Sequence, residues 1–135
     1  MHTKKEMLRA VMEGVAYSLR DCMEICREMN INVSDMMACG GGGSSPLWRQ
    51  MLADLYGCPV KTSASKEGPA LGVAILAMVA AGIYATVPEA CEQICGVDKV
   101  QEPVADHVPQ YEKFYRLYTE IYPAVKEQMK ELAEM

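Results

Sequence analysis

The sequence predicts a helix-rich α/β chain that contains one short parallel β-α-β unit. Helical spacing of apolar residues dominates both ends of the chain, and two short apolar runs, Val33–Cys39 and Pro59–Thr62, flank a predicted helix. Two strands connected through a helix in this way are parallel neighbours in one sheet. The 135 residues are 50% hydrophobic and 23% charged, which suits one globular unit with a buried core.

The first predicted helix begins at Thr3. Thr3 and Glu6 have the spacing of a capping box, in which each side chain accepts a hydrogen bond from the other residue's backbone amide. Apolar residues then recur every three or four positions, at Leu8, Val11, Met12, Val15, Leu19, Cys22, Met23 and Cys26. This stripe predicts one long amphipathic helix that ends near Met29 and Asn30.

Val33–Cys39 is predicted to be a buried strand that enters a glycine turn at Gly40–Gly43. A helix follows the turn, with Ser44 or Ser45 as its cap and Gly57 as its stop. Because Pro59–Thr62 leaves room for only a brief second strand, the β-α-β unit is small.

An uncharged segment, Pro69–Ala85, is predicted to form a third helix, with Ser65 as its cap. Its length only reaches the lower limit for a membrane span, and its far end lacks basic anchors. We therefore expect this segment to be buried in protein and not in a membrane. A fourth helix is expected over Val87–Cys95, after a turn at 82–84.

The end of the chain is predicted to be a connecting loop, Gln101–Pro109, followed by an aromatic helix. The apolar face of this helix consists of Tyr111, Phe114, Tyr115, Tyr118, Ile121, Tyr122 and Val125. Pro123 is expected to kink or break the helix, leaving Lys126–Met135 as a charged amphipathic tail. Since two short strands make a marginal sheet, we expect the chain to be part of a larger fold.

The charge balance excludes several partners. Thirteen basic against eighteen acidic residues give a net charge of −5, and no basic cluster offers a surface for nucleic acid or anionic membranes. The first residues lack the apolar core of a signal peptide, which predicts a cytoplasmic location with the six cysteines as reduced thiols. Cys22/Cys26 and Cys91/Cys95 are each one helical turn apart, so a zinc site remains an alternative to buried thiols.

Four consecutive glycines between a strand and a helix suggest a nucleotide site, because they allow close backbone approach to a ligand. A flexible glycine-rich connection is the alternative. The run is not a Walker loop, since no lysine follows Gly43, and no acidic residue stands at the position that a dinucleotide fold requires. A serine hydrolase is disfavoured too, because His2 and His107 both lie in segments expected to be exposed.

Three ordered blocks of sequence carry a family resemblance. They are TKKEMLRAVMEGVAYSLRD at 3–21, GGGGSSPLWRQMLAD at 40–54 and EGPALGVA at 67–74. Together they resemble the C-terminal part of FGGY-type carbohydrate kinases, most of all the xylulose kinase subgroup. The resemblance implies an α/β fragment of the second domain of an actin-like ATPase (ribonuclease H-like) fold, with residues 1–135 as an incomplete C-terminal portion of that domain.

The resemblance also implies a function and a site. Family members transfer the γ-phosphate of Mg²⁺-bound ATP to a sugar hydroxyl, and the resemblance to this subgroup implies xylulose as the sugar. The adenosine part of ATP maps to Gly40, Gly41, Gly42 and Ser45. The catalytic aspartate, the Mg²⁺ ligands and most sugar contacts map upstream of this chain, so we expect no catalytic or metal residue in it. Arg49 is expected to be a solvated or paired structural charge.

We therefore expect the isolated chain to be inactive, although its parent would be an ATP-dependent sugar kinase. The alternative is a non-catalytic module that oligomerises or retains residual nucleotide binding. The missing strands would leave one edge of Val33–Cys39 unpaired, and the apolar side chains of Val11, Val15, Leu19 and Ile75 would be exposed. These features predict a homodimer or larger assembly.

Overall fold

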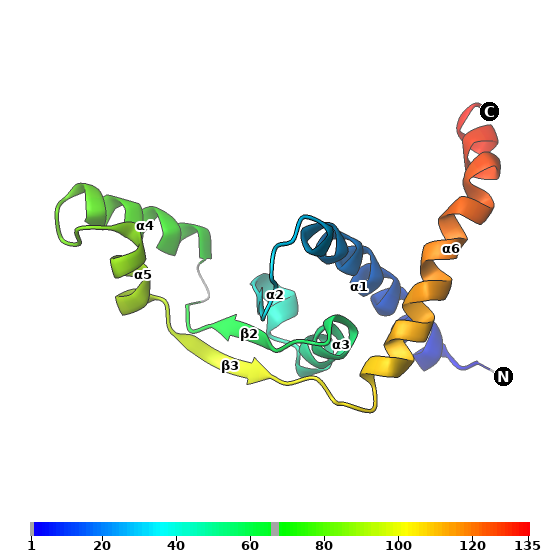
Figure 1. Cartoon of the computed structure of the whole chain (residues 1–135), viewed down its shortest axis with the longest axis horizontal. Coiled ribbons are helices and arrows are strands. Elements are labelled where there is room, and N and C mark those ends of the chain that lie inside the picture. The colour runs from blue at the N-terminus through cyan, green and yellow to red at the C-terminus, as the bar shows by residue number, and fades with distance from the viewer. Residues whose placement is uncertain (1, 66–67) are drawn as a thin grey trace.

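The computed structural model describes residues 2–65 and 68–135. In chain order the elements are α1 (Lys4–Glu28), β1 (Met36–Ala38), α2 (Gly40–Gly43), α3 (Pro46–Tyr56), β2 (Val60–Ser63), α4 (Gly68–Ala80), α5 (Val87–Ile94), β3 (Val97–Gln101) and α6 (Val108–Ala133). Figure 1 shows a body formed by α1, α3, the sheet and the first half of α6, from which the α4–α5 hairpin projects on one side.

The predicted start and end of α1 are confirmed. The Thr3 side chain accepts from the backbone of Lys5, and the Glu6 carboxylate accepts from the Thr3 amide at 2.6 Å, which completes the capping box. At the other end Asn30 has a φ of 60°, the left-handed conformation that asparagine tolerates better than most residues. The Thr3 side chain thus caps the first turn of the helix, and the left-handed backbone of Asn30 ends it.

The sheet has three strands in the order β1-β2-β3. β1 and β2 are parallel, with Met36 opposite Val60 and Ala38 opposite Thr62, which confirms the parallel β-α-β unit. The first strand is shorter than the predicted Val33–Cys39, because only its last residues reach the register of β2. Within the described sheet β1 pairs on one side only, as expected.

β3 corrects the sequence prediction of a two-stranded sheet. It pairs antiparallel with β2, and its last residue, Gln101, lies opposite Val60. The predicted loop from Gln101 therefore shrinks to residues 102–107, between β3 and α6. β3 is mostly exposed and carries few apolar residues, so backbone pairing with β2, and not a buried apolar pattern, holds it in place.

The glycine run also differs from the prediction, because it forms the one-turn helix α2 instead of an open turn. Gly43 is buried against the preceding strand, where a Cβ atom would lie 2.8 Å from the Ala38 carbonyl oxygen. α3 then begins at Ser45, whose hydroxyl accepts from the Trp48 amide, and ends at Gly57 with a φ of 66°. Ser45, and not Ser44, is thus the cap, and Gly57 is the predicted stop.

The core lies between α1, α3, β2 and the first half of α6. Its largest fully buried side chains are Met51, Leu55 and Val60. Tyr17 of α1 packs among three tyrosines of α6, with ring centroids 6.4 Å from Tyr111, 6.2 Å from Tyr115 and 5.2 Å from Tyr118. The first part of the tyrosine-rich face is therefore a packing surface.

Pro123 was predicted to kink or break the last helix; α6 continues through Pro123, so the break does not occur. Proline removes one backbone hydrogen bond, and the helix formers that follow it, including Lys126, Glu127 and Met129, support the remaining turns. The second half of this helix leaves the body (Figure 1), and Ile121, Tyr122 and Leu132 are exposed.

The uncharged segment was predicted to be buried, and this is wrong for most of its residues. In α4 only Ile75 is buried, which also corrects the expectation that Ile75 is exposed; Val73 and Leu76 are 68% and 59% exposed. Within the described residues the main packing partner of α4 is α5, and the two helices extend away from the core (Figure 1). None of the described helices is both long and apolar enough for a membrane span. The predicted cap at Ser65 involves residues 66 and 67, which lie outside the described residues.

Candidate functional site

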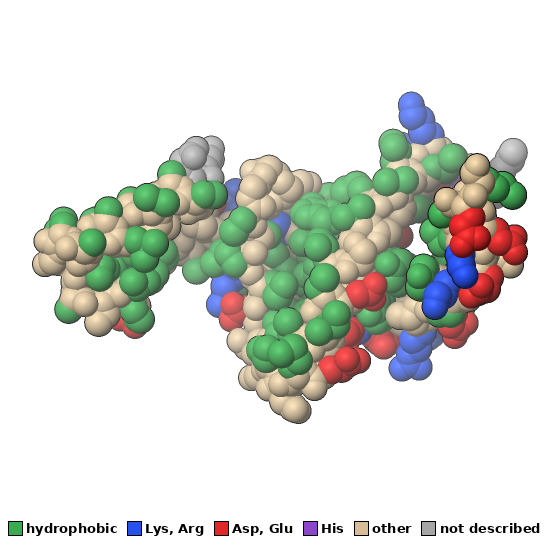
Figure 2. Space-filling view, turned by 90° about the horizontal axis from the view of Figure 1, so that it is seen from above, with side chains coloured by type: hydrophobic (Ala, Val, Ile, Leu, Met, Phe, Trp, Pro, Cys, Tyr) green, Lys and Arg blue, Asp and Glu red, His purple; other side chains and the backbone are tan. Residues whose placement is uncertain are grey.

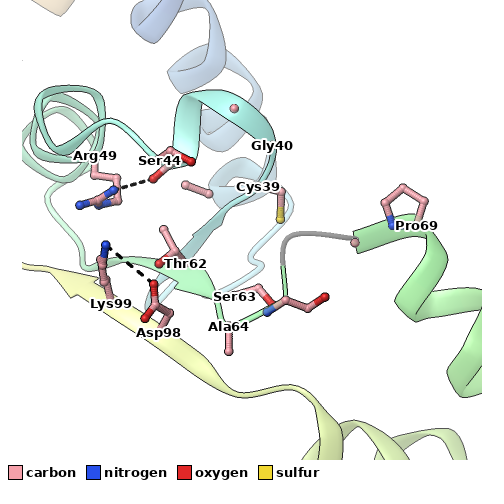
Figure 3. A pocket seen from close by; sticks show the side chains of 15 residues that line it. Cys39, Gly40, Ser44, Arg49, Thr62, Ser63, Ala64, Pro69, Asp98 and Lys99 are labelled. Atoms are coloured by element: carbon pink, nitrogen blue, oxygen red, sulfur yellow. Dashed lines mark hydrogen bonds and ion pairs between the residues drawn. The ribbon is translucent and has the colours of Figure 1, made fainter.

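A cavity of about 570 Å³ opens at the carboxyl ends of the parallel strands β1 and β2 (Figure 3). Such edges are where open α/β sheets bind ligands. The glycine helix α2 forms one wall, Ala64 and Ser65 together with the start of α4 form another, and β3 closes the third side. The described lining residues are Ala38, Cys39, Gly40, Gly41, Gly43, Ser44, Arg49, Thr62, Ser63, Ala64, Ser65, Gly68, Pro69, Asp98 and Lys99.

Two of the four predicted adenosine residues, Gly40 and Gly41, line this cavity. Gly40 has a φ of 72°, which favours glycine, and a Cβ atom on Gly41 would have no atom within 4 Å. Gly42 faces Trp48 instead, since its Cβ would lie 3.3 Å from the indole ring. Successive residues of a helix are rotated by about 100°, so consecutive glycines cannot all face one cavity.

The fourth predicted residue, Ser45, is not among the lining residues. Its hydroxyl accepts from the Trp48 amide at 3.3 Å and caps α3. Ser45 and Gly42 therefore lie behind the cavity wall, where they fix the start of α3 and the position of the indole. The partly buried Trp48 packs against the core.

Arg49 was expected to be a solvated or paired charge, and the structure corrects this. Its side chain is buried, lines the cavity and donates from Nη1 to the Gly43 carbonyl oxygen at 2.6 Å. The last backbone carbonyls of a helix have no partner within the helix, so a positively charged donor stabilises them. The Arg49 guanidinium does this for the carbonyl of Gly43, the last residue of α2. Arg49 thus fixes the wall that carries Gly40 and Gly41.

Sequence reasoning missed the residues opposite the glycine helix. Thr62 belongs to a predicted strand, but nothing in the sequence placed its side chain in the cavity. Asp98 and Lys99 belong to β3, which was not predicted as a strand. A strand prediction for 97–101 would have found them, because Lys99 pairs directly with Thr62.

A second cavity, of about 250 Å³, lies between α1 and α6. Arg9 and Glu13 form an ion pair at 2.8 Å there, and the Tyr111 hydroxyl lies 2.7 Å from Arg9 Nη2. Burial raises the pKa of Tyr111, and the neighbouring Glu13 raises the pKa of Arg9. His107 lines this cavity and contacts Asp54 at 2.8 Å, but none of the described lining residues offers a hydroxyl or thiol nucleophile apart from the Tyr111 phenol. The described residues of this cavity therefore do not assemble a serine hydrolase site.

The donor set does not fit a magnesium ion. Asp98 is the only carboxylate among the described residues that line the larger cavity, and it lies 3.9 Å from the Lys99 ammonium. Across residues 2–65 and 68–135 no three His, Cys, Asp or Glu side chains come together as a metal site, the cysteine pairs included. Magnesium prefers carboxylate, water and phosphate oxygens, so these residues alone would not hold it.

The sequence model of the C-terminal domain of the FGGY carbohydrate kinases matches residues 1–81, which include α1, the glycine helix, β2 and α4. The chain belongs to the FGGY family of carbohydrate kinases. Xylulose kinase from Staphylococcus epidermidis is 36% identical over 126 residues, which cover 93% of this chain and 25% of that protein. The FGGY chain described here thus spans about a quarter of the length of such relatives.

Solved structures agree with the family assignment. The ligand-bound xylulose kinase from Lactobacillus acidophilus is 31% identical, superposes with a TM-score of 0.84 and matches 93% of this chain and 26% of its own. A gluconate kinase from Lactobacillus acidophilus, also 31% identical, gives a TM-score of 0.83, with 92% of this chain and 25% of that chain covered. The fold is therefore that of the actin-like sugar kinases, represented here by a helix-rich α/β portion.

Proposed function

We propose that this chain is the C-terminal nucleotide-binding portion of an ATP-dependent carbohydrate kinase that phosphorylates a hydroxyl of xylulose. The glycine-lined cavity at the carboxyl edge of the sheet carries the proposal, because it combines a ligand-sized space with glycine backbone that leaves room for a ligand to approach. In this proposal Gly40 and Gly41 contact the adenosine of ATP. Gly42 and Ser45 support that contact from behind, through Trp48 and the start of α3.

The proposal assigns nucleotide binding, and not catalysis, to the chain itself. Phosphoryl transfer needs a base for the hydroxyl proton, groups around the transferred phosphate and Mg²⁺. The larger cavity offers one carboxylate among its described residues, paired with a lysine, which is too little for both a base and a metal site. We therefore expect ATP and Mg²⁺ to act in the parent enzyme and the isolated chain to be inactive, in the cytoplasm where ATP is available and its six cysteines stay reduced.

ATP titration of the purified chain, with Gly41→Val as the test variant, examines this proposal. Because a Cβ atom at Gly41 would have no neighbouring atom within 4 Å and Gly41 lines the cavity, valine at this position should take up part of the ligand space. Gly72→Val is the matched control, since Gly72 lies in α4 with equally open surroundings and does not line the cavity. We expect weak, millimolar ATP binding that the first variant abolishes and the second preserves. Binding that ignores Gly41→Val would place the nucleotide elsewhere.

A second candidate role is self-association, which the exposed apolar residues of α1 favour. Val11, Val15 and Leu19 are 69%, 51% and 43% exposed along one side of that helix, and β1 has an unpaired edge within the described sheet. An exposed apolar helix face and an open strand edge each suit pairing with a second copy. We propose a homodimer that buries more than about 1,000 Å². Sedimentation of a cooperatively folded monomer at micromolar concentration would refute it.

A further inference from the structure

Arg49 carries a buried charge without a counter-ion among the described residues. Its side chain is 5% exposed, its Nη1 atom donates to a neutral backbone carbonyl at Gly43, and its Nε atom is buried with no partner in the described part of the chain. A buried charge is costly unless an opposite charge and further hydrogen bonds compensate it. Since Arg49 lines the larger cavity, an anion there would supply that compensation.

Two more polar side chains, those of Thr62 and Lys99, face the same cavity from its floor. Ala38, Thr62 and Lys99 are register partners across β1, β2 and β3, and paired residues of neighbouring strands lie on the same face of the sheet. All three line the cavity. Figure 3 shows the Lys99 ammonium and the Arg49 guanidinium on the same side of the cavity, with the Thr62 hydroxyl beside them.

Thr62 and Lys99 both have unused hydrogen-bonding capacity within the described structure. Thr62 is 8% exposed, and its Oγ1 atom has no partner within the described residues. The Lys99 ammonium contacts the carboxylate of its neighbour Asp98 only at 3.9 Å, beyond hydrogen-bond distance. The cavity is therefore lined by two cations, Arg49 and Lys99, and by the Thr62 hydroxyl. The single carboxylate among the described lining residues, Asp98, neutralises only one of the two positive charges.

We propose that Arg49, Thr62 and Lys99 form an oxyanion subsite for a phosphate group at the floor of the cavity. Arg49 is held in place by Gly43, Thr62 supplies a hydroxyl donor, and Lys99 closes over the anion on its flexible stem. The phosphate comes either from a bound nucleotide or from free phosphate. The subsite shares the cavity with the proposed adenosine contacts but does not rest on them, and Lys99 lies outside the region that the family model matches.

Titration of the full chain with inorganic phosphate at constant ionic strength, followed through backbone amide chemical shifts, tests the subsite. We expect millimolar binding with shifts at Thr62 and Lys99. Lys99→Met should weaken binding roughly tenfold, the loss expected for one charge-assisted hydrogen bond. Lys126→Met removes the same charge from the exposed tail of α6 and should leave the affinity unchanged. Absence of phosphate-dependent shifts in the millimolar range, or equal effects of both variants, would overturn the proposal.

Further variants separate the subsite from general charge. Lys99→Arg should restore phosphate binding, and Thr62→Val, which keeps the shape and removes the hydroxyl, should weaken it by a smaller factor. Lys99→Arg and Thr62→Val should each keep the wild-type thermal unfolding midpoint within a few degrees. Lys99 is exposed, and Thr62 has no side-chain hydrogen bond to lose in the described structure. Full phosphate affinity in Lys99→Met and Thr62→Val together would contradict the assignment.

Adenosine and AMP distinguish the two sources of phosphate. If the subsite holds the phosphate of a nucleotide, AMP binds more tightly than adenosine, Lys99→Met removes that difference, and inorganic phosphate competes with AMP. If it holds free phosphate, phosphate binds equally well with and without AMP. Failure of the adenosine site would appear separately, as ATP binding that ignores Gly41→Val, whereas failure of the subsite appears as phosphate binding that ignores Lys99→Met.

Discussion

The body and the α4–α5 hairpin bury their apolar residues to very different extents. In the body, α3 places Met51, Leu52 and Leu55 in a core shared with α1, β2 and α6. In the hairpin only Ile75 and Ala90 are buried, although α4 is the most apolar helix of the chain. Figure 2 shows apolar side chains spread over the projecting hairpin, while charged side chains gather at the opposite end of the molecule. The body has its own core, and the hairpin presents surface that suits a contact with other parts of a larger protein.

Hydrogen bonds between different elements are found in the body, whereas those described for the α4–α5 hairpin are local. Arg20 of α1 donates to the Leu55 carbonyl oxygen at 2.8 Å and to Glu112 of α6 at 2.6 Å, so one side chain joins three helices. Asp54 accepts from the Val104 amide at 2.7 Å and thereby fixes the loop before α6. The described hydrogen bonds of the hairpin are local ones, such as Glu89 to the Thr86 hydroxyl. The comparison predicts that stability resides in the body.

The largest expected effect comes from shortening a core side chain of α3. Leu55→Ala should lower the free energy of unfolding by about 2–5 kcal/mol, because Leu55 is 1% exposed and its removal leaves a cavity. Leu76→Ala makes the same change in the hairpin at an exposed position and should cost less than about 0.5 kcal/mol. Urea unfolding of both variants provides the measurement, and similar losses would contradict the division into body and hairpin.

A smaller effect is expected for the Arg20 contacts. Arg20→Met should lower the free energy of unfolding by about 1–3 kcal/mol, because it leaves the Leu55 carbonyl without its donor. Arg116→Met is the matched control: Arg116 pairs with Glu112 at 3.5 Å but is 76% exposed, so its loss should be close to zero. Equal midpoints for both variants in urea would show that Arg20 does not join the helices.

The stability of the same two variants should depend differently on pH. The Arg20 guanidinium holds the pKa of Glu112 below its usual range. A carboxyl whose pKa is lowered in the folded state contributes stability above its unfolded pKa of about 4.3, and this contribution is lost as the pH falls through the folded value. Arg20→Met should therefore reduce the loss of stability on acidification below about pH 4, whereas Arg116→Met should largely preserve it.

The smallest effect concerns the buried tyrosines of the body. Burial raises the pKa of Tyr17 and of Tyr56 to about 12. Their neutral forms stabilise the fold below the unfolded pKa of about 10, and this stabilisation is lost as the pH rises through the folded values. Ultraviolet titration of the phenols should show ionisations near pH 12 that become fewer in Tyr17→Phe. Complete ionisation near pH 10 in the folded chain would contradict the packing of Tyr17 against α6.

Local signals in the sequence predicted much of this fold. Thr3, Ser45 and Gly57 mark helix ends through interactions with neighbouring residues, so their roles follow from short segments alone. β3 could not be predicted in this way, because its pairing with β2 crosses the whole α4–α5 hairpin and its own residues are mostly polar or exposed. The burial of Arg49 likewise depends on the packing of α2 against β1.

The site was predictable only in part, for the same reason. The glycine run pointed to the correct wall of the cavity, but the helical geometry of α2 decides that Gly41 faces the ligand space and Gly42 faces Trp48. Lys99 enters the cavity only because β3 places it beside Thr62. Contacts between segments distant in the sequence thus decide which residues complete the site.

The most direct test of the account maps ATP on the isotope-labelled chain by amide chemical shifts. The account predicts that shifts concentrate at Gly40, Gly41 and Ala64, which surround the larger cavity, and that Gly41→Val removes them. Shifts that concentrate instead around Arg9 and His107, which line the second cavity, would contradict the assignment of the glycine helix as the nucleotide site.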